Sequence, residues 1–292
     1  MPGAKHQKTV ALTGATGFVG TYLQKTLTIK GWKVIPLGRI DFQCEESVLA
    51  KKIAGVEVII NLAGAPVLGR WTESFKKNLY DSRITLTTKL VRAISLMEKK
   101  PEAFLSASAI GIYASEGDHT EENNYRADTF LGNLAGAWED AALAAESLGV
   151  RATVLRLGVV LGKDGGALQK MLPAFKLGVG GTIGSGKQAF SWIHLEDLTK
   201  VFETVISDQS CRGIYNVTAP EPATNRELTK ELGRILSRPT ILPVPEFVLN
   251  ILFGEGAQIL TTGQKVYPKR LLDAGFSFKY PTLNSALKAC LA

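Results

Sequence analysis

Short apolar runs alternate with amphipathic stretches along roughly the first half of the chain. Residues 82–97 and 133–148, and a stretch around Val19 to Leu27, carry apolar side chains at helical spacing. The runs of strand length are Thr9–Leu12, Val34–Leu37, Val56–Leu62, Ala103–Ser106 and Ala152–Leu157. Continuous apolar runs suit strands that are covered on both faces, and their alternation with helices is typical of βαβ units. The pattern predicts an α/β fold with a doubly wound parallel sheet.

The regular alternation weakens in the second half, and beyond Pro220 the sequence indicates helices separated by prolines. We predict a sheet domain over residues 1–162 and a smaller, mostly helical C-terminal lobe over 163–292. A segment near 191–220 is expected to return to the sheet domain, because Tyr215–Val217 has the composition of one more strand. A cleft between two such lobes is where this fold class holds ligands.

Gly14, Gly17 and Gly20 form a GxxGxxG turn directly after the first predicted strand. The first glycine of such a turn permits a sharp bend, the second lets backbone N–H groups approach a pyrophosphate, and the third allows close contact between helix and sheet. The N-terminus of the next helix faces the same anion. The motif in this context predicts dinucleotide binding and makes the expected sheet Rossmann-type.

The end of the second predicted strand bears on the choice of nucleotide. An NAD site usually carries an acidic residue there, which bonds the ribose hydroxyls. Here the strand ends in Leu37, Gly38 and Arg39, and an arginine suits a 2′-phosphate through charge-assisted hydrogen bonds. Asp41 is close enough to act as the ribose acid if the strand boundary shifts by two residues. We favour NADP(H), with an ordinary solvated Arg39 as the alternative.

A set of short segments carries a family likeness. They are Gly14–Gly20, Asn61–Gly64, Arg70–Thr72, Asp81–Ile84, Ser106–Ser108, Leu157–Gly162 and Trp192–Leu198. The C-terminal run Gly263–Arg270, followed by Ala274–Phe276, is the most distinctive. Through nearly its whole length the chain resembles the extended short-chain dehydrogenase/reductases, and within them the atypical, nucleotide-sugar-epimerase-like branch of epimerase family proteins.

The resemblance implies a domain that binds NADP(H) and a lobe that binds a substrate. It also implies cofactor contacts. Gly14 and the turn Thr16, Gly17, Phe18 and Val19 are expected along the pyrophosphate, Gly38 and Arg39 at the adenosine phosphate, and Leu62, Ala63 and Gly64 along the cofactor. Arg83 occupies the family's Ser-Arg pair and is also expected to reach the cofactor; the alternative is an arginine on a helix surface with no ligand.

One part of the family pattern is missing. Typical members carry a Tyr with a Lys four residues later, so that the lysine and the nicotinamide lower the pKa of the phenol for proton exchange. None of the seven tyrosines has a lysine at that spacing. On the helix expected to carry the pair, Leu131 and Ala135 stand in the two positions, and neither side chain can move a proton.

Substitutes for the missing pair are Ser108 and Tyr113, which follow a strand near the expected nicotinamide. Tyr113 is a candidate proton donor, although an unassisted phenol has a pKa of about 10; packing and hydrogen bonding are its alternative role. Ser108 is expected to orient a carbonyl or an amide. We expect His194 to be a buried or helix-capping residue rather than a general acid or base, because a lone histidine usually bonds to backbone.

Charge, cysteine content and hydropathy bear on the partners and the compartment of the protein. The chain of 292 residues has 34 Lys and Arg against 27 Asp and Glu, a net charge of +7, but the basic residues come in pairs rather than runs, so nucleic-acid binding is not predicted. The scattered Cys44, Cys211 and Cys290 fit a reducing cytoplasm, and no metal motif is present. No apolar run reaches about 18 residues, so no membrane span is expected.

These observations predict an NADP(H)-binding, epimerase-like oxidoreductase that acts on a small-molecule substrate. The missing Tyr/Lys pair motivates an alternative, a non-catalytic NADP(H)-binding sensor or scaffold protein. A nucleic-acid-associated protein is a third possibility that only the net charge supports. Neither the substrate nor the oligomeric state follows from the sequence.

Overall fold

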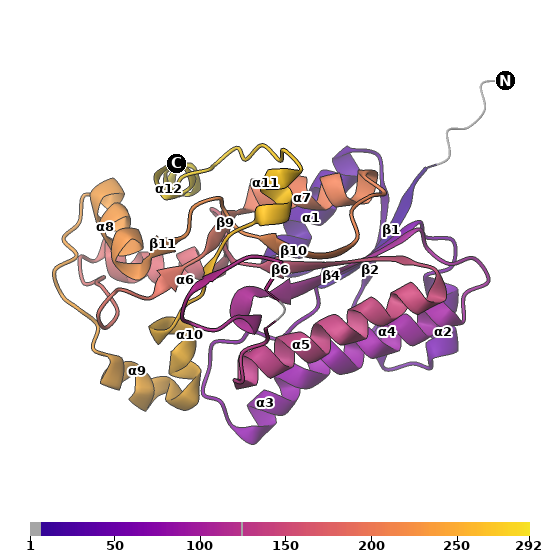
Figure 1. The fold of residues 1–292 in the computed structure, drawn as a ribbon, viewed down its shortest axis with the longest axis horizontal. Helices are drawn as coiled ribbons and strands as arrows, with labels where there is room; N and C mark the ends of the chain where they lie inside the picture. The colour runs from indigo at the N-terminus through magenta and orange to yellow at the C-terminus, as the bar shows by residue number, and fades with distance from the viewer. Residues whose placement is uncertain (1–6, 124) are drawn as a thin grey trace.

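A six-stranded parallel sheet forms the centre of the computed structural model, which describes residues 7–123 and 125–292 (Figure 1). In sheet order the strands are β10 (Gly213–Val217), β6 (Arg151–Leu157), β4 (Ala103–Ala109), β3 (Val58–Asn61), β1 (Thr9–Thr13) and β2 (Lys33–Leu37). All five neighbouring pairs are parallel. The connections reverse direction between β1 and β3, which makes this the switch point where such sheets bind ligands. The predicted α/β, doubly wound fold is confirmed.

Helices cover both faces of this sheet (Figure 1). On one face, α1 (Phe18–Ile29) and α7 (Leu195–Ser207) pack against Val10 and Leu12 of β1. On the other face lie α2 (Glu46–Lys52), α4 (Leu86–Ser95) and α5 (Phe130–Leu143), around a core that includes Ala11 and Ile59. Successive strand residues thus enter different cores, which is why the strands are apolar without alternation.

A continuous helical run precedes β4 in the chain. It begins at α3 (Glu73–Tyr80), where the Thr72 hydroxyl accepts a hydrogen bond from the Phe75 N–H, and it passes through a π-helical turn, η2 (Asp81–Thr85), into α4. Single π turns inside α-helices often occur at functional sites because they redirect a side chain. Here the π turn contains Arg83.

The C-terminal part of the chain adds mostly helices at one end of the sheet (Figure 1). They are α6 (Gly166–Lys176), α8 (Asn225–Leu236), α9 (Glu246–Phe253), α10 (Gln258–Thr261) and α12 (Leu283–Leu291), whereas α11 (Lys269–Asp273) lies against β10, on the face that α1 and α7 cover. A separate core that includes Leu168, Trp192 and Leu232 holds several of them together. Strand β10 and helix α7 lie with the main sheet, although they follow residue 163 in the chain. The division into domains at residue 162 stays a prediction.

Short strand pairs connect this part to the rest. They are β7 (Val159–Leu161) with β9 (Trp192–His194), β8 (Ala189–Phe190) with β11 (Ala223–Thr224), and β5 (Asp118–His119) with β12 (Lys265–Val266). The short 3₁₀ segments are η1 (Arg39–Phe42), η3 (Ile110–Ile112), η4 (Ala144–Leu148) and η5 (Gly254–Ala257).

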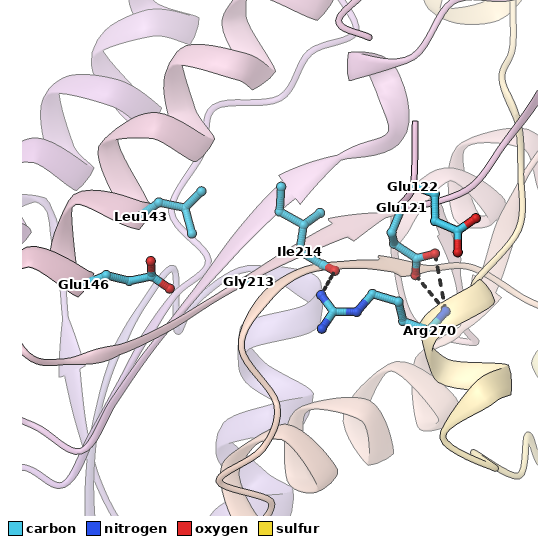
Figure 2. Close-up of a pocket in the computed structure, with 7 residues that line it drawn as sticks. All are labelled: Glu121, Glu122, Leu143, Glu146, Gly213, Ile214 and Arg270. Carbon is cyan, nitrogen blue, oxygen red and sulfur yellow. Dashed lines mark hydrogen bonds between the residues drawn. The ribbon is translucent and has the colours of Figure 1, made fainter. Parts of the chain in front are cut away.

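The outer edge of β10 is closed by side chains from elsewhere in the chain (Figure 2). The Arg270 guanidinium donates to the Ile214 carbonyl at 2.6 Å, and the Glu121 carboxylate accepts from the Asn216 N–H at 2.9 Å. Both residues line a pocket of about 460 Å³ together with Glu122, Leu143, Glu146, Gly213 and Ile214. Three strands separate β10 from β1 in the sheet, so this pocket is distinct from the switch point.

Candidate nucleotide-binding site

The glycine-rich turn packs backbone against backbone. Gly14 has φ +67°, and a Cβ at this position would lie 2.6 Å from the Leu62 carbonyl oxygen. A Cβ on Gly20 would lie 2.1 Å from the Gly14 carbonyl oxygen. Both positions therefore require glycine. The third glycine was expected to bring helix and sheet together; in the structure it brings α1 against the turn itself.

The first turn of α1 presents backbone N–H groups without a competing acid. Gly17 occupies the N-cap position, no side chain caps the helix there, and the first turn contains no acidic residue. The first N–H groups of a helix have no partner within it. Together with the helix dipole, these groups form a site for an anion beside Thr16 and Phe18.

A buried pair of polar side chains fixes the loop after β3 next to this turn. The Thr13 hydroxyl donates to Asn61 Oδ1 at 2.7 Å and accepts from the N–H groups of Leu62 and Ala63, both at 3.0 Å. The Asn61 amide in turn donates to Thr87 at 2.8 Å. The loop that was expected to lie along the cofactor is thus held at the switch point by Asn61, which belongs to one of the family segments, and by Thr13 and Thr87, which sequence reasoning did not single out.

Arg83 reaches this same loop from the π turn. Its Nη2 donates to the Ala65 carbonyl at 2.9 Å, and a Cβ on Gly64 would lie 3.1 Å from the guanidinium carbon. The guanidinium also lies over the Trp138 ring, 5.3 Å from its centroid. The side chain is therefore packed against the loop rather than extended into solvent, and its contact with the cofactor stays a prediction.

Among the described residues, no acidic side chain neutralises the charge of Arg83. Within residues 7–123 and 125–292, no carboxylate lies within 4.0 Å of its guanidinium. Burial lowers the pKa of Arg83 to about 10, so the group stays positively charged at neutral pH. A half-buried cation without a counterion, beside Gly64 at the switch point, suits an anionic ligand.

At the end of β2, the two candidate side chains have different surroundings. Asp41 accepts a hydrogen bond from the Gly38 N–H at 2.8 Å and forms an ion pair with Lys52. Burial tends to raise the pKa of Asp41, but Lys52 and the Gly38 N–H outweigh burial and hold the pKa below its ordinary value. Arg39 is exposed, and its side chain has no hydrogen bond or ion pair to another described residue. Of the two side chains, Arg39 is thus the one available to bind a nucleotide phosphate.

The glycine-rich loop after β7 packs around the start of α1. A Cβ on Gly162 or on Gly165 would lie 2.7 or 2.4 Å from the Phe18 ring. Phe18 is the first residue of α1, so this loop borders the N–H groups of the candidate site. The side chains of Lys163 and Asp164 are exposed on the same loop.

Ser108 and Tyr113 belong to a buried polar network. The Ser108 hydroxyl donates to Glu139 on α5 at 2.7 Å, and Glu139 forms a buried ion pair with Arg156 on β6. Arg156 Nη1 donates to the Tyr113 hydroxyl at 2.6 Å, and that hydroxyl lies 2.9 Å from Asn216 Oδ1. Burial raises the pKa of Tyr113, and Arg156 offsets only part of this rise. The catalytic roles of Ser108 and Tyr113 stay predictions; the structure assigns both hydroxyls partners within the protein.

His194 has the capping role that we expected. It is the N-cap of α7, its Nδ1 accepts a hydrogen bond from the Glu196 N–H at 3.2 Å, and its ring packs 4.0 Å from the Tyr280 ring centroid. Burial lowers the pKa of His194, which favours the neutral ring that this acceptor role requires.

Metal-ligand clusters and membrane-spanning helices are both absent from the part of the chain that the structure describes. No group of three or more His, Cys, Asp or Glu side chains there is placed to hold a metal ion. No helix there has the length and apolar character needed to cross a membrane.

Comparison with known proteins shows the family. The NAD dependent epimerase/dehydratase family matches residues 10–218, and a domain of unknown function, DUF1731, matches residues 244–290. This chain belongs to the epimerase family. The predicted resemblance is therefore confirmed, and the distinctive C-terminal run lies within the second match.

Members of the epimerase family match nearly the whole chain. An Arabidopsis thaliana relative, "Epimerase family protein SDR39U1 homolog, chloroplastic", is 40% identical over 98% of this chain and 87% of its own length. The Bacillus subtilis epimerase family protein YfhF is 36% identical over 97% of this chain and 98% of its own. The crystal structure of human epimerase family protein SDR39U1 with NADPH has a TM-score of 0.87 and 34% identity, and the match covers 96% of this chain and 98% of the human one.

Proposed function

We propose that this chain binds NADP(H) at the carboxyl edge of its sheet and acts as an oxidoreductase of the epimerase family on a small-molecule substrate. The observation that carries the proposal is the Arg83 guanidinium, which lies against Gly64 and has no carboxylate partner among the described residues, at the switch point that the first turn of α1 also borders. The NADPH in the human relative supports this choice of cofactor.

The residues present fit such a cofactor. Gly14 and the turn Thr16–Val19 would hold the pyrophosphate through backbone N–H groups, and Leu62, Ala63 and Gly64 would lie along the cofactor beside Arg83. The available Arg39 side chain would bind the 2′-phosphate, next to Gly38, whose own N–H is donated to Asp41. Bound at these residues, NADPH supplies a hydride from its nicotinamide ring. The chain itself supplies position and positive charge.

A second candidate function is non-catalytic NADP(H) binding, as in a sensor or scaffold protein. It is favoured by the network around Ser108 and Tyr113, because Glu139, Arg156 and Asn216 already occupy both hydroxyls. For either hydroxyl to exchange a proton with a substrate, this network would have to open. The absence of a Tyr/Lys pair points the same way.

Binding and turnover separate these functions. Protein stripped of nucleotide is titrated with NADPH and with NADH by intrinsic fluorescence, and Arg39→Ala is expected to weaken NADPH about tenfold while NADH changes little. Absence of binding by either nucleotide would overturn the proposal. Oxidation of NADPH by a defined carbonyl compound supports the oxidoreductase, whereas tight binding without turnover across a carbonyl panel supports the second candidate.

For the compartment we propose the cytoplasm. The support is chemical: Cys44, Cys211 and Cys290 are all free thiols in the described structure, as in proteins of a reducing environment.

A further inference from the structure

Two side chains with opposite effects on cofactor choice follow β2. Asp41 is an acid of the kind found in NAD sites, and Arg39 is a base of the kind that binds the 2′-phosphate of NADP. Asp41 stands two residues after Arg39 on the same 3₁₀ segment, η1. Its Oδ2 accepts a hydrogen bond of 2.8 Å from the N–H of Gly38, the residue that the proposed function places next to the 2′-phosphate. An unneutralised carboxylate here would repel a phosphate dianion, and it would be placed to accept hydrogen bonds from ribose hydroxyls, as in NAD sites.

Lys52 removes both effects. It is the last residue of α2, and its Nζ pairs with Oδ1 of Asp41, so one carboxylate oxygen faces Lys52 and the other faces the Gly38 N–H. The Asp41 side chain is 12% exposed and that of Lys52 is 40% exposed, so the acid is the better shielded partner. Both acceptor oxygens are thereby committed within the protein.

The segment does not depend on Lys52 alone for its position. Lys89 of α4 donates to the carbonyl of Phe42 at 3.0 Å and also to the carbonyl of Cys44. The Asp41 bond to the Gly38 N–H closes the start of η1 from within the segment. Removal of the Lys52 charge therefore changes the electrostatics of this corner more than its backbone.

We propose that Lys52 sets the preference of this site for NADPH over NADH by neutralising Asp41 and holding its carboxylate away from the nucleotide. Lys52 acts through Asp41 and is a positioning residue. The proposal rests on the NADP(H) function above, and it makes the preference a property of three side chains, Arg39, Asp41 and Lys52.

A charge-deletion cycle tests this role. Lys52→Met is expected to raise the NADPH dissociation constant about three- to tenfold, with the NADH constant unchanged or lower. Asp41→Asn in the Lys52→Met chain removes the freed charge and keeps an acceptor for the Gly38 N–H, so it is expected to restore NADPH binding. Lys52→Arg is expected to keep the preference. Lys51→Met, at the exposed neighbouring position on α2, is the matched control and should leave both constants unchanged.

The outcomes distinguish the two proposals. If the wild-type chain binds neither nucleotide, the proposed function and this inference both fail. If the wild-type chain prefers NADPH and Lys52→Met keeps that preference, or weakens both nucleotides equally, the role of Lys52 is refuted and the proposed function stands. Failure of Asp41→Asn to rescue Lys52→Met also refutes the role. The effect of Lys52→Met is expected to shrink at 1 M salt, because the charges are near the surface.

Discussion

The Arg156 guanidinium and the Glu139 carboxylate form two hydrogen bonds, from Nε to Oε1 at 2.8 Å and from Nη2 to Oε2 at 2.7 Å. Their side chains are 7% and 1% exposed. This buried ion pair joins strand β6 to helix α5, and it contacts Ser108 through Glu139 and Tyr113 through Arg156. Each of the two charges requires the other as its counterion.

Glu139→Ala is expected to destabilise the protein by about 3–5 kcal/mol, because it leaves the buried Arg156 without its counterion. The control is Asp140→Ala, which breaks the exposed pair between Asp140 and Arg126 and should cost about 1 kcal/mol or less. Urea unfolding followed by circular dichroism measures both free energies of unfolding. Similar losses in the two variants would show that the buried pair contributes no more to the free energy of unfolding than the exposed pair.

Arg83→Met is expected to weaken NADPH binding about tenfold or more, because it removes an uncompensated cation from the proposed site. The same change should lower the stability of the ligand-free protein by no more than about 1 kcal/mol, since the lost contacts are partly offset by relief of charge burial. Fluorescence titration and thermal melting measure the two effects. Arg92→Met, at a side chain 70% exposed on α4, should change neither. A large loss of stability with unchanged affinity would assign Arg83 a purely structural role.

Gly20→Ala is expected to abolish measurable NADPH binding, because its Cβ would lie 2.1 Å from the Gly14 carbonyl oxygen and would displace the turn. Gly31→Ala serves as the comparison: it introduces a Cβ at φ +85° with nothing within 4 Å, so it should cost about 1 kcal/mol of stability and leave binding intact. Calorimetric titration measures the NADPH affinity of both variants. Wild-type affinity in Gly20→Ala would show that the turn does not form part of the site.

The protein is expected to lose stability as the pH falls below the ordinary His pKa of 6.5, partly through His194. Burial lowers the pKa of His194 in the folded state, so below pH 6.5 the unfolded chain binds a proton that the folded chain does not, and unfolding becomes easier. His194→Asn keeps an acceptor at the N-cap of α7 and removes the titration. Urea unfolding at pH 7.5 and pH 5.5 should show a smaller decrease for this variant; equal decreases would exclude His194 as a source.

The sequence was sufficient for the fold because its signals are local. The apolar runs, the glycine turn and the lone His194 each carry their meaning within a few neighbouring residues, and the structure confirms the sheet, the turn and the cap. The predicted boundaries of elements differ from those in the structure where a polar side chain sets the end of an element. Helix α5 starts at Phe130 rather than near residue 133, because the Thr129 hydroxyl caps it through the Gly132 N–H.

The long-range polar pairs could not be predicted in this way. Thr13 and Asn61 lie 48 residues apart in the chain, and their pairing depends on the adjacency of β1 and β3. Glu139 and Arg156 are each unusual in the sequence, because one is an acid in an alanine-rich helix and the other is a base in the apolar strand 152–157. Only the packing of the helix on the sheet shows that they form a pair. Arg83 lies in a π turn, which has no reliable sequence signature.

The closed edge of β10 has a consequence for how the protein behaves at high concentration. An open strand edge invites further strands from other molecules, and natural proteins obstruct such edges with charged side chains. Here the obstruction includes Arg270, which lies within the segment matched by DUF1731. This C-terminal segment therefore does more than complete a lobe: a truncated chain that ends before residue 269 would expose the Ile214 carbonyl as a template for intermolecular β-pairing and would be prone to aggregate.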